Sequence, residues 1–171
     1  MIKELKQMQK LKIFSYGLKP RNIVEAYVLA ARASEMNPTA KMQAFRKVID
    51  FCEQDVVCAK EDSIKRNTLL FWSYDKVAQA EMHHKRYGEA LSLWLKSCSL
   101  SVSPYALIRQ GNKMLSLIDS GKLNILEKAK NLCQIAVCLQ KAYLETGQSE
   151  EAEKMKRLQE ISASILQRSE N

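Results

Sequence analysis

Two adjacent histidines, His83 and His84, are the only histidines in the chain and the first place to look for chemistry. Neighbouring helical residues point about 100° apart, so these imidazoles cannot bind one metal ion as an i, i+4 pair does. The surrounding stretch EMHHKRYGEALSLW is typical of a helix end, where imidazoles, Lys85 and Arg86 favour the negative end of the helix dipole. We expect neither metal binding nor acid–base chemistry there, and His83 stays a candidate partner contact.

The cysteines are the other side chains that could bind a metal or act as nucleophiles, and they are Cys52, Cys58, Cys98, Cys133 and Cys138. Their number is odd and none form a CxxC pair, so the pattern indicates neither a disulfide framework nor a zinc site. We interpret them as reduced thiols that pack as small apolar side chains. No Gly-rich phosphate loop, nucleophile elbow, HExxH or paired-carboxylate pattern appears in the sequence. Neither an enzyme nor a bound cofactor is therefore expected.

The chain is basic, with a formal net charge of +8 that is concentrated in two regions. Residues 1–21 carry six basic side chains against one acidic, and residues 95–141 carry seven against two. A basic protein is drawn to nucleic acid, to anionic lipid or to an acidic partner, and charge alone does not choose among them.

Five residues of the second basic region form a candidate phosphate-binding face, and they are Arg109, Lys113, Lys122, Lys128 and Lys130. This region lacks the interleaved aromatic residues that single-strand binders use. We therefore interpret the face as mainly solvated, and a nucleic-acid-associated helical protein remains the alternative function.

The element pattern predicts an all-α fold. The chain contains only five glycines and three prolines, helix-forming residues recur throughout, and no polar–apolar alternation lasts long enough for a strand. Apolar residues repeat at helical spacing instead. Eight helices are expected, over residues 3–15, 23–36, 38–59, 62–84, 87–100, 104–118, 122–146 and 149–168. The short connections imply stacked antiparallel helical hairpins.

Helix start and stop signals support these bounds. N-caps are expected at Asn22, Asn37 and Ser103, and the last two are followed by proline at the first helical position. Glu25 lies three residues after Asn22 and completes the pattern of a capping box. Gly147 is expected to end a helix as its C-terminal cap.

We expect a single domain over residues 1–171, in which residues 1–21 form a basic N-terminal helix and linker and residues 22–171 form the hairpins. The N-terminal segment places Ile2 and Leu5 on one apolar stripe with lysines opposite. Such a stripe packs on the domain itself or docks elsewhere, on a membrane or a partner. Charges interrupt every apolar run near the N-terminus, so a cytoplasmic protein without a transmembrane segment is expected.

The segment from Tyr74 to Ser97 resembles a tetratricopeptide repeat, a helix–turn–helix unit of about 34 residues. The residues that match its packing positions are Tyr74, Ala78, Tyr87, Ala90 and Trp94. Glu81 departs from the aromatic residue that the family has there. A second match begins near Ala136, and its matching residues are Leu139, Tyr143, Gly147 and Ala152. The segments 22–60 and 104–135 have helix-pair character without the repeat spacing.

The resemblance implies a short right-handed superhelix of stacked hairpins, with an irregular helical bundle as the structural alternative. It also implies a groove lined by the first helix of each pair. The groove residues would be Trp72, Asp75, Gln79, Met82 and His83 in one unit and Gln134, Val137, Lys141 and Leu144 in the last. Trp and Met are favoured at such surfaces, although Trp72 could equally belong to the core.

These patterns favour a non-enzymatic protein–protein interaction module, such as an adaptor, scaffold or chaperone. It would bind a protein or peptide segment in the groove that the resemblance implies. The net positive charge favours an acidic partner. The sequence leaves the partner's identity and the oligomeric state open.

Overall fold

The computed structural model describes residues 19–54, 60–123 and 125–169, and every regular element within them is an α-helix. The helices are α2 (Ile23–Ala33), α3 (Pro38–Gln54), α4 (Lys60–His83), α5 (Tyr87–Ser97), α6 (Pro104–Asp119), α7 (Ile125–Glu145) and α8 (Ser149–Ser169). The all-α prediction is thus confirmed. Where both ends are described, the expected bounds agree with the observed ones to within three residues. The helix expected over residues 3–15 lies outside the described residues.

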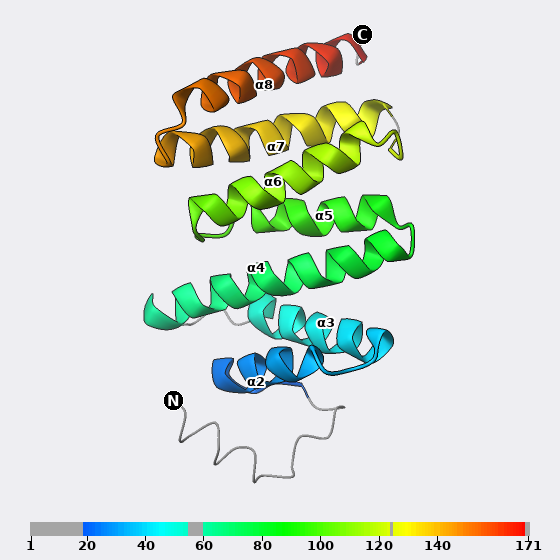
Figure 1. The fold of residues 1–171 in the computed structure, drawn as a ribbon, viewed down its shortest axis with the longest axis vertical. Coiled ribbons are helices and arrows are strands. Elements are labelled where there is room, and N and C mark those ends of the chain that lie inside the picture. The colour runs from blue at the N-terminus through cyan, green and yellow to red at the C-terminus, as the bar shows by residue number, and fades with distance from the viewer. Residues whose placement is uncertain (1–18, 55–59, 124, 170–171) are drawn as a thin grey trace.

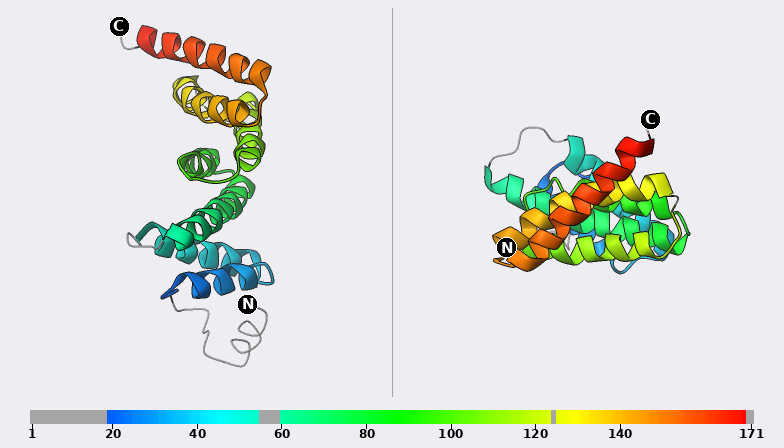
Figure 2. Two further views of the ribbon diagram at one scale, coloured as in Figure 1. Left: turned by 90° about the vertical axis from the view of Figure 1, so that its left-hand side faces the viewer. Right: turned by 90° about the horizontal axis from the view of Figure 1, so that it is seen from above.

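The helices form an elongated stack in which successive helices run antiparallel, from α2 at one end to α8 at the other (Figure 1). Each helix packs mainly against its neighbours in chain order, and α7 and α8 form the most extensive pair. A side view shows that α5 and α7 stand on the same side of α6 (Figure 2, left). None of the described helices combines the length and hydropathy that a membrane span requires.

Two of the expected N-caps are confirmed. Asn22 Oδ1 accepts a hydrogen bond from the Glu25 backbone N–H at 2.9 Å, and Asn37 Oδ1 accepts one from the Ala40 N–H at 2.9 Å. The Glu25 carboxylate does not complete a capping box with Asn22. It accepts hydrogen bonds from the Arg21 backbone N–H and guanidinium, each at 2.9 Å, because that cation offers a charged partner.

Ser103 stands at the N-cap position before α6 as predicted, but the predicted capping by its side chain is wrong. Ser103 makes no side-chain capping hydrogen bond. Its backbone carbonyl accepts instead from the N–H groups of Ala106 at 2.9 Å and Leu107 at 3.2 Å. The helix still begins at Pro104 as predicted, because proline there leaves one fewer N–H group to satisfy.

Gly147 ends α7 as expected. Its φ of +75° lies in the left-handed region that glycine adopts without strain. The Gln148 N–H bonds to the Tyr143 carbonyl at 2.8 Å, and the Gly147 N–H bonds to the Leu144 carbonyl at 3.1 Å. These two hydrogen bonds make a Schellman motif, which satisfies carbonyls that the helix end leaves free.

The buried residues form two hydrophobic clusters that meet at α4. The first cluster joins α2, α3 and part of α4, and its members include Leu29, Phe45, Val48, Leu69, Leu70 and Tyr74. The second joins the end of α4 to the helices that follow, and its members include Leu91, Trp94, Met114, Ile135, Leu139 and Tyr143. Because α4 supplies Val77 to the first and Ala78 to the second, this helix ties the two halves of the stack together.

The residues assigned to repeat packing lie where packing requires them. The buried ones are Tyr74, Ala78, Ala90, Trp94, Leu139, Tyr143 and Ala152. Tyr87 is half-buried at the start of α5 and packs against the second cluster. Burial at these positions fits any close helix stack, so it leaves the kind of repeat open.

Gly111 sets a close approach that the sequence analysis missed. A Cβ atom added at this position in α6 would lie 2.3 Å from Leu139 Cδ2 and 2.6 Å from Leu139 Cγ. Leu139 is fully buried, so its side chain would have to shift against packed neighbours. An isolated glycine inside a helical pattern was the available signal, since such a glycine often marks a packing contact.

Candidate functional site

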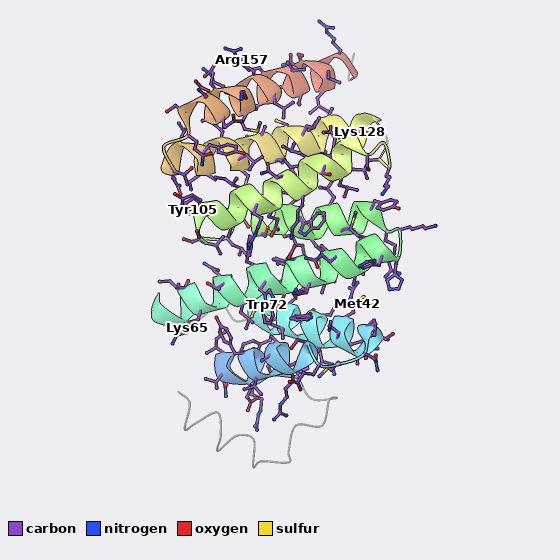
Figure 3. The ribbon with its side chains drawn as sticks, in the orientation of Figure 1. Met42, Lys65, Trp72, Tyr105, Lys128 and Arg157 are labelled. Carbon is purple, nitrogen blue, oxygen red and sulfur yellow. The ribbon has the colours of Figure 1, made fainter. Side chains whose placement is uncertain are left out.

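The predicted groove residues of α4 mostly take part in internal packing. The Trp72 ring meets the Phe45 ring edge-on, with centroids 5.2 Å apart and planes at 81°. Figure 3 places Trp72 beside α3. Met82 packs against the second hydrophobic cluster. Both side chains are half-buried, so α4 offers less free surface here than the resemblance implies.

Asp75 links three helices. Its carboxylate accepts hydrogen bonds from Trp94 Nε1 of α5 at 3.0 Å and from Lys113 Nζ of α6 at 2.7 Å. Gln79, one turn along α4, donates a third hydrogen bond at 2.7 Å. Two of the predicted groove residues, Asp75 and Gln79, therefore bond to each other and to the stack. Lys113, which the sequence assigned to the basic face, is one of the hydrogen-bond donors to Asp75.

Glu81 is a fully buried carboxylate that joins α3 to the turn after α4. It accepts a hydrogen bond from Arg46 at 2.5 Å and another from Arg86. Burial raises the pKa of the Glu81 carboxyl, but the hydrogen bonds and charges of Arg86 and Arg46 outweigh burial and leave it below its usual value. The residue that departed from the tetratricopeptide pattern is thus an ion-pair junction.

The histidine pair marks a helix end, as expected. His83 is the last residue of α4, and both imidazoles are exposed. The following Lys85 has a φ of +61°, and Arg86 N–H bonds to the Glu81 carbonyl at 2.9 Å. Lys85 therefore occupies the left-handed position of a second Schellman motif. Among the described residues, no three His, Cys, Asp or Glu side chains are grouped so that they could hold a metal ion.

A groove of about 530 Å³ lies between α5 and α7 and opens to solvent. It combines apolar, basic and uncharged polar residues, and they are Gly88, Leu91, Ser92, Leu95, Lys96, Leu123, Lys130, Asn131 and Gln134. No carboxylate is among these lining residues. Lys96 is shared with Glu53 of α3, whose carboxylate lies 3.1 Å from its Nζ. Leu91, Leu95 and Leu123 supply the apolar part of the lining, and the two lysines come from opposite walls.

The α7 wall is part of a longer exposed stripe. Its residues recur at helical spacing and are Lys130, Gln134, Val137, Lys141 and Leu144. Val137 is 48% exposed and Leu144 is 59% exposed, although both are apolar. The sequence analysis assigned the last four to a partner surface, and the structure places them on the free face of α7. The helix that faces this wall is α5 and not α4.

The residues of α5 that line the groove were not predicted from the sequence. Leu91 and Leu95 follow the helical repeat that also contains Ala90 and Trp94, and this spacing indicated core residues. Leu91 is buried, whereas Leu95 is half-buried and borders the groove. Helical periodicity alone does not distinguish an apolar residue at the edge of the core from one that lines a groove.

The five residues of the predicted basic face lie in different environments. Lys113 bonds to Asp75, while Lys122 lies over the Tyr87 ring with its Nζ 4.7 Å from the centroid. Lys130 borders the groove. Lys128 lies near the start of α7 (Figure 3), and Arg109 is exposed on α6.

A second hollow of about 530 Å³ lies at the α2–α3 turn, and its lining residues are Arg32, Glu35, Met36, Asn37 and Ala40. Arg32 and Glu35 give it charges of both signs, so it is the weaker candidate for binding a segment of one charge.

Comparison of the chain with protein-family models, with curated proteins and with solved structures gave no match. The resemblance to tetratricopeptide repeats therefore rests on the residues that carry it.

Proposed function

We propose that this chain is a non-enzymatic protein–protein interaction module that binds an acidic, partly apolar segment of a partner protein between α5 and α7. The observation that carries the proposal is the α5–α7 groove, which is lined by three leucines and by Lys96 and Lys130, with no carboxylate among its lining residues. Adaptor, scaffold and chaperone proteins all use surfaces of this kind.

Two physical effects would act together on such a segment. Apolar side chains of the partner gain free energy when they cover Leu95 and Leu123, at roughly 25 cal/mol per Å² of apolar surface removed from water. Carboxylates at the segment's edges would meet Lys130 and the shared Lys96. Charge complementarity of this kind speeds association and selects against basic partners. The open shape suits a helix or extended segment better than an enclosed small molecule.

In this proposal the stack is a short right-handed superhelix of the tetratricopeptide kind. The free stripe on α7 supports it, because four positions that the resemblance assigned to the groove are exposed there. The matching positions on α4 are largely committed to packing, so the proposed binding surface moves to α5.

A negative charge introduced on each of the two walls tests the proposal. Ser92→Glu and Lys130→Glu each place a carboxylate at the groove, and both positions are exposed enough to spare the core. Lys156→Glu makes the same charge change as Lys130→Glu on an exposed face of α8 and serves as the matched control. Partners are captured with the full chain from its native host, and the bound segment is then titrated by fluorescence anisotropy.

The expected result is that both groove variants weaken binding of an acidic segment about tenfold, while Lys156→Glu leaves it near the wild-type value. Thermal melts of all variants establish that each is folded. Partners that bind equally well to the groove variants and to the control would overturn the proposal. Binding to unrelated RNA or DNA that falls steeply with salt, and that Lys130→Glu and Lys156→Glu weaken alike, would favour the nucleic-acid alternative instead.

A further inference from the structure

Lys96 lines the α5–α7 groove, yet its charge is engaged outside it. Its Nζ donates to Glu53 Oε1 of α3 at 3.1 Å and lies 5.8 Å from the centroid of the Tyr74 ring of α4. Along the stack, α5 lies between α3 and α7 (Figures 1 and 2). The ammonium group of Lys96 therefore serves the α3 side of α5, while its long apolar stem can border the groove.

Glu53 is held in place by a second donor. The hydroxyl of the buried Tyr74 donates to the same Glu53 oxygen at 2.7 Å. This hydrogen bond lowers the pKa of the Glu53 carboxyl, partial burial raises it, and the hydrogen bond and charge of Lys96 lower it again, so that it ends below its ordinary value. Because Tyr74 belongs to the first hydrophobic cluster, its hydroxyl keeps the carboxylate in position even when Lys96 turns elsewhere.

The lysine on the α7 wall is in a different environment. Lys130 lines the groove and is exposed, and it makes no ion pair with any side chain that the structure describes. Farther along the same stripe, the side chain of Lys141 is 80% exposed and lies 3.9 Å from Glu145, which is a long contact for an ion pair. The two walls thus differ, because α7 presents its lysines to solvent whereas Glu53 offsets the charge of the lysine on α5.

We propose that the groove recognises the carboxylates of an acidic segment along its α7 wall, and that Glu53 imposes this preference by holding the charge of Lys96 on the α3 side of α5. A partner carboxylate at the α5 wall would have to displace Glu53 from Lys96 and then remain near its negative charge. The partner that fits best is an amphipathic segment with acidic residues on the edge over α7 and uncharged residues on the edge over α5. This preference rests on the proposed binding of a segment between the two helices.

Glutamine substitutions measure what each lysine contributes. The probe is a short fluorescein-labelled peptide of leucine and glutamate, titrated with the full chain by fluorescence anisotropy. The same peptide with glutamine in place of glutamate reports binding without charge. We expect Lys130→Gln to weaken binding of the acidic peptide about threefold, and Lys96→Gln to change it by less than about twofold.

Glu53→Gln makes the charge of Lys96 available to the groove. It should tighten binding of the acidic peptide about threefold, a change typical of one exposed ion pair, and leave the glutamine peptide unaffected. Adding Lys96→Gln to Glu53→Gln should abolish this gain. Asp50→Asn removes the same charge from an exposed position three residues earlier on α3, and this matched control should bind like the wild type. Thermal melts establish that each variant is folded.

The possible results distinguish this preference from the proposed function. If Lys130→Gln weakens binding but Glu53→Gln leaves it unchanged, the groove binds segments and Glu53 does not set the preference. Equal losses in Lys96→Gln and Lys130→Gln would also overturn the preference, and this comparison needs no variant of Glu53 to fold. Equal tightening in Glu53→Gln and Asp50→Asn would assign the effect to the net charge of α3 instead. A peptide that does not bind, or whose binding none of the groove variants alters, would contradict the proposed function itself.

Discussion

At the scale of single residues, Glu81 shows how a charge can be built into the interior. Its carboxylate is fully buried, and the guanidinium groups of Arg46 and Arg86 that bind it are about half exposed. A buried carboxylate is costly to desolvate, and the loss of its partners leaves that cost uncompensated. The junction holds α3 against the α4–α5 turn, so this residue connects parts of the stack that apolar packing alone would join less specifically.

Stability should fall in acid because of Glu81. Its pKa is lower in the folded chain than the ordinary value of 4.5, so the unfolded chain binds more protons as the pH drops. The stabilisation is therefore fully present above about pH 4.5 and is lost as the pH falls through the folded-state pKa. Urea unfolding at several pH values between 7 and 3 should show this decline.

Glu81→Gln supplies the comparison for that pH series. It should cost about 3 kcal/mol at neutral pH and flatten the acid decline, because the amide keeps the shape but loses the charge. Glu35→Gln, at an exposed position after α2, is the control and should leave the decline near that of the wild type. An acid decline of equal steepness in Glu81→Gln would show that other carboxylates cause it.

Lys85 carries a backbone conformation that costs a non-glycine residue free energy. Its φ of +61° matches the +75° of Gly147, and both end a helix in the same way. Lys85→Gly should therefore raise the free energy of unfolding by about 1 kcal/mol, whereas Gly147→Ala should lower it by a similar amount. Chemical denaturation of the two variants measures both changes. A destabilised Lys85→Gly variant would contradict this account of the turn.

At the scale of the helices, small side chains decide how closely neighbours approach. Ala78, Ala90 and Ala142 are buried between helices, and Gly111 allows α6 to come closest to Leu139 of α7. The sequence analysis identified the first two through the repeat resemblance. It did not identify Gly111, since a glycine in a helical pattern does not reveal which side chain lies above it.

Gly111→Ala should lower the free energy of unfolding by about 2 kcal/mol, because the new methyl group would overlap the fully buried Leu139 and force its side chain to shift. Gly88→Ala provides the matched control in α5. No heavy atom lies within 4 Å of the Cβ added there, so alanine should instead stabilise the helix by about 0.5–1 kcal/mol. Thermal and urea unfolding compare the two, and equal effects would contradict the proposed contact.

At the scale of the whole molecule, the stack consists of two hydrophobic clusters that share α4. Stacked helices contact mainly their chain neighbours, so stability is transmitted along the stack from one interface to the next. A mutation that destabilises one cluster should therefore increase local unfolding first in the helices that form that cluster.

Phe45→Ala should remove about 3–5 kcal/mol from the first cluster. Hydrogen exchange followed by mass spectrometry should then show faster exchange in α2 and α3, while α6 and α7 keep most of their protection. Met114→Ala in the second cluster should give the opposite distribution. Equal loss of protection in every helix would show that the stack unfolds as one cooperative unit.

The sequence by itself determined the all-α fold, the order of the described helices and most of their ends. Helical periodicity, asparagine caps and Gly147 act through neighbours in the chain, and local interactions of this kind can be read without tertiary information. The exposed stripe on α7 contains four positions that the tetratricopeptide resemblance assigned to a groove, and residues at this helical spacing must share a face.

Only the tertiary structure decided which helix faces that stripe and what Glu81 binds. Each depends on residues far apart in the sequence that come together when the hairpins stack. The same apolar spacing suits a core and a groove lining equally well, so periodicity did not separate the half-buried Leu95 from its buried neighbour Leu91. The tetratricopeptide resemblance placed Trp72 in a groove and left the core as the alternative. Burial, which depends on the neighbouring helices, distinguishes the two.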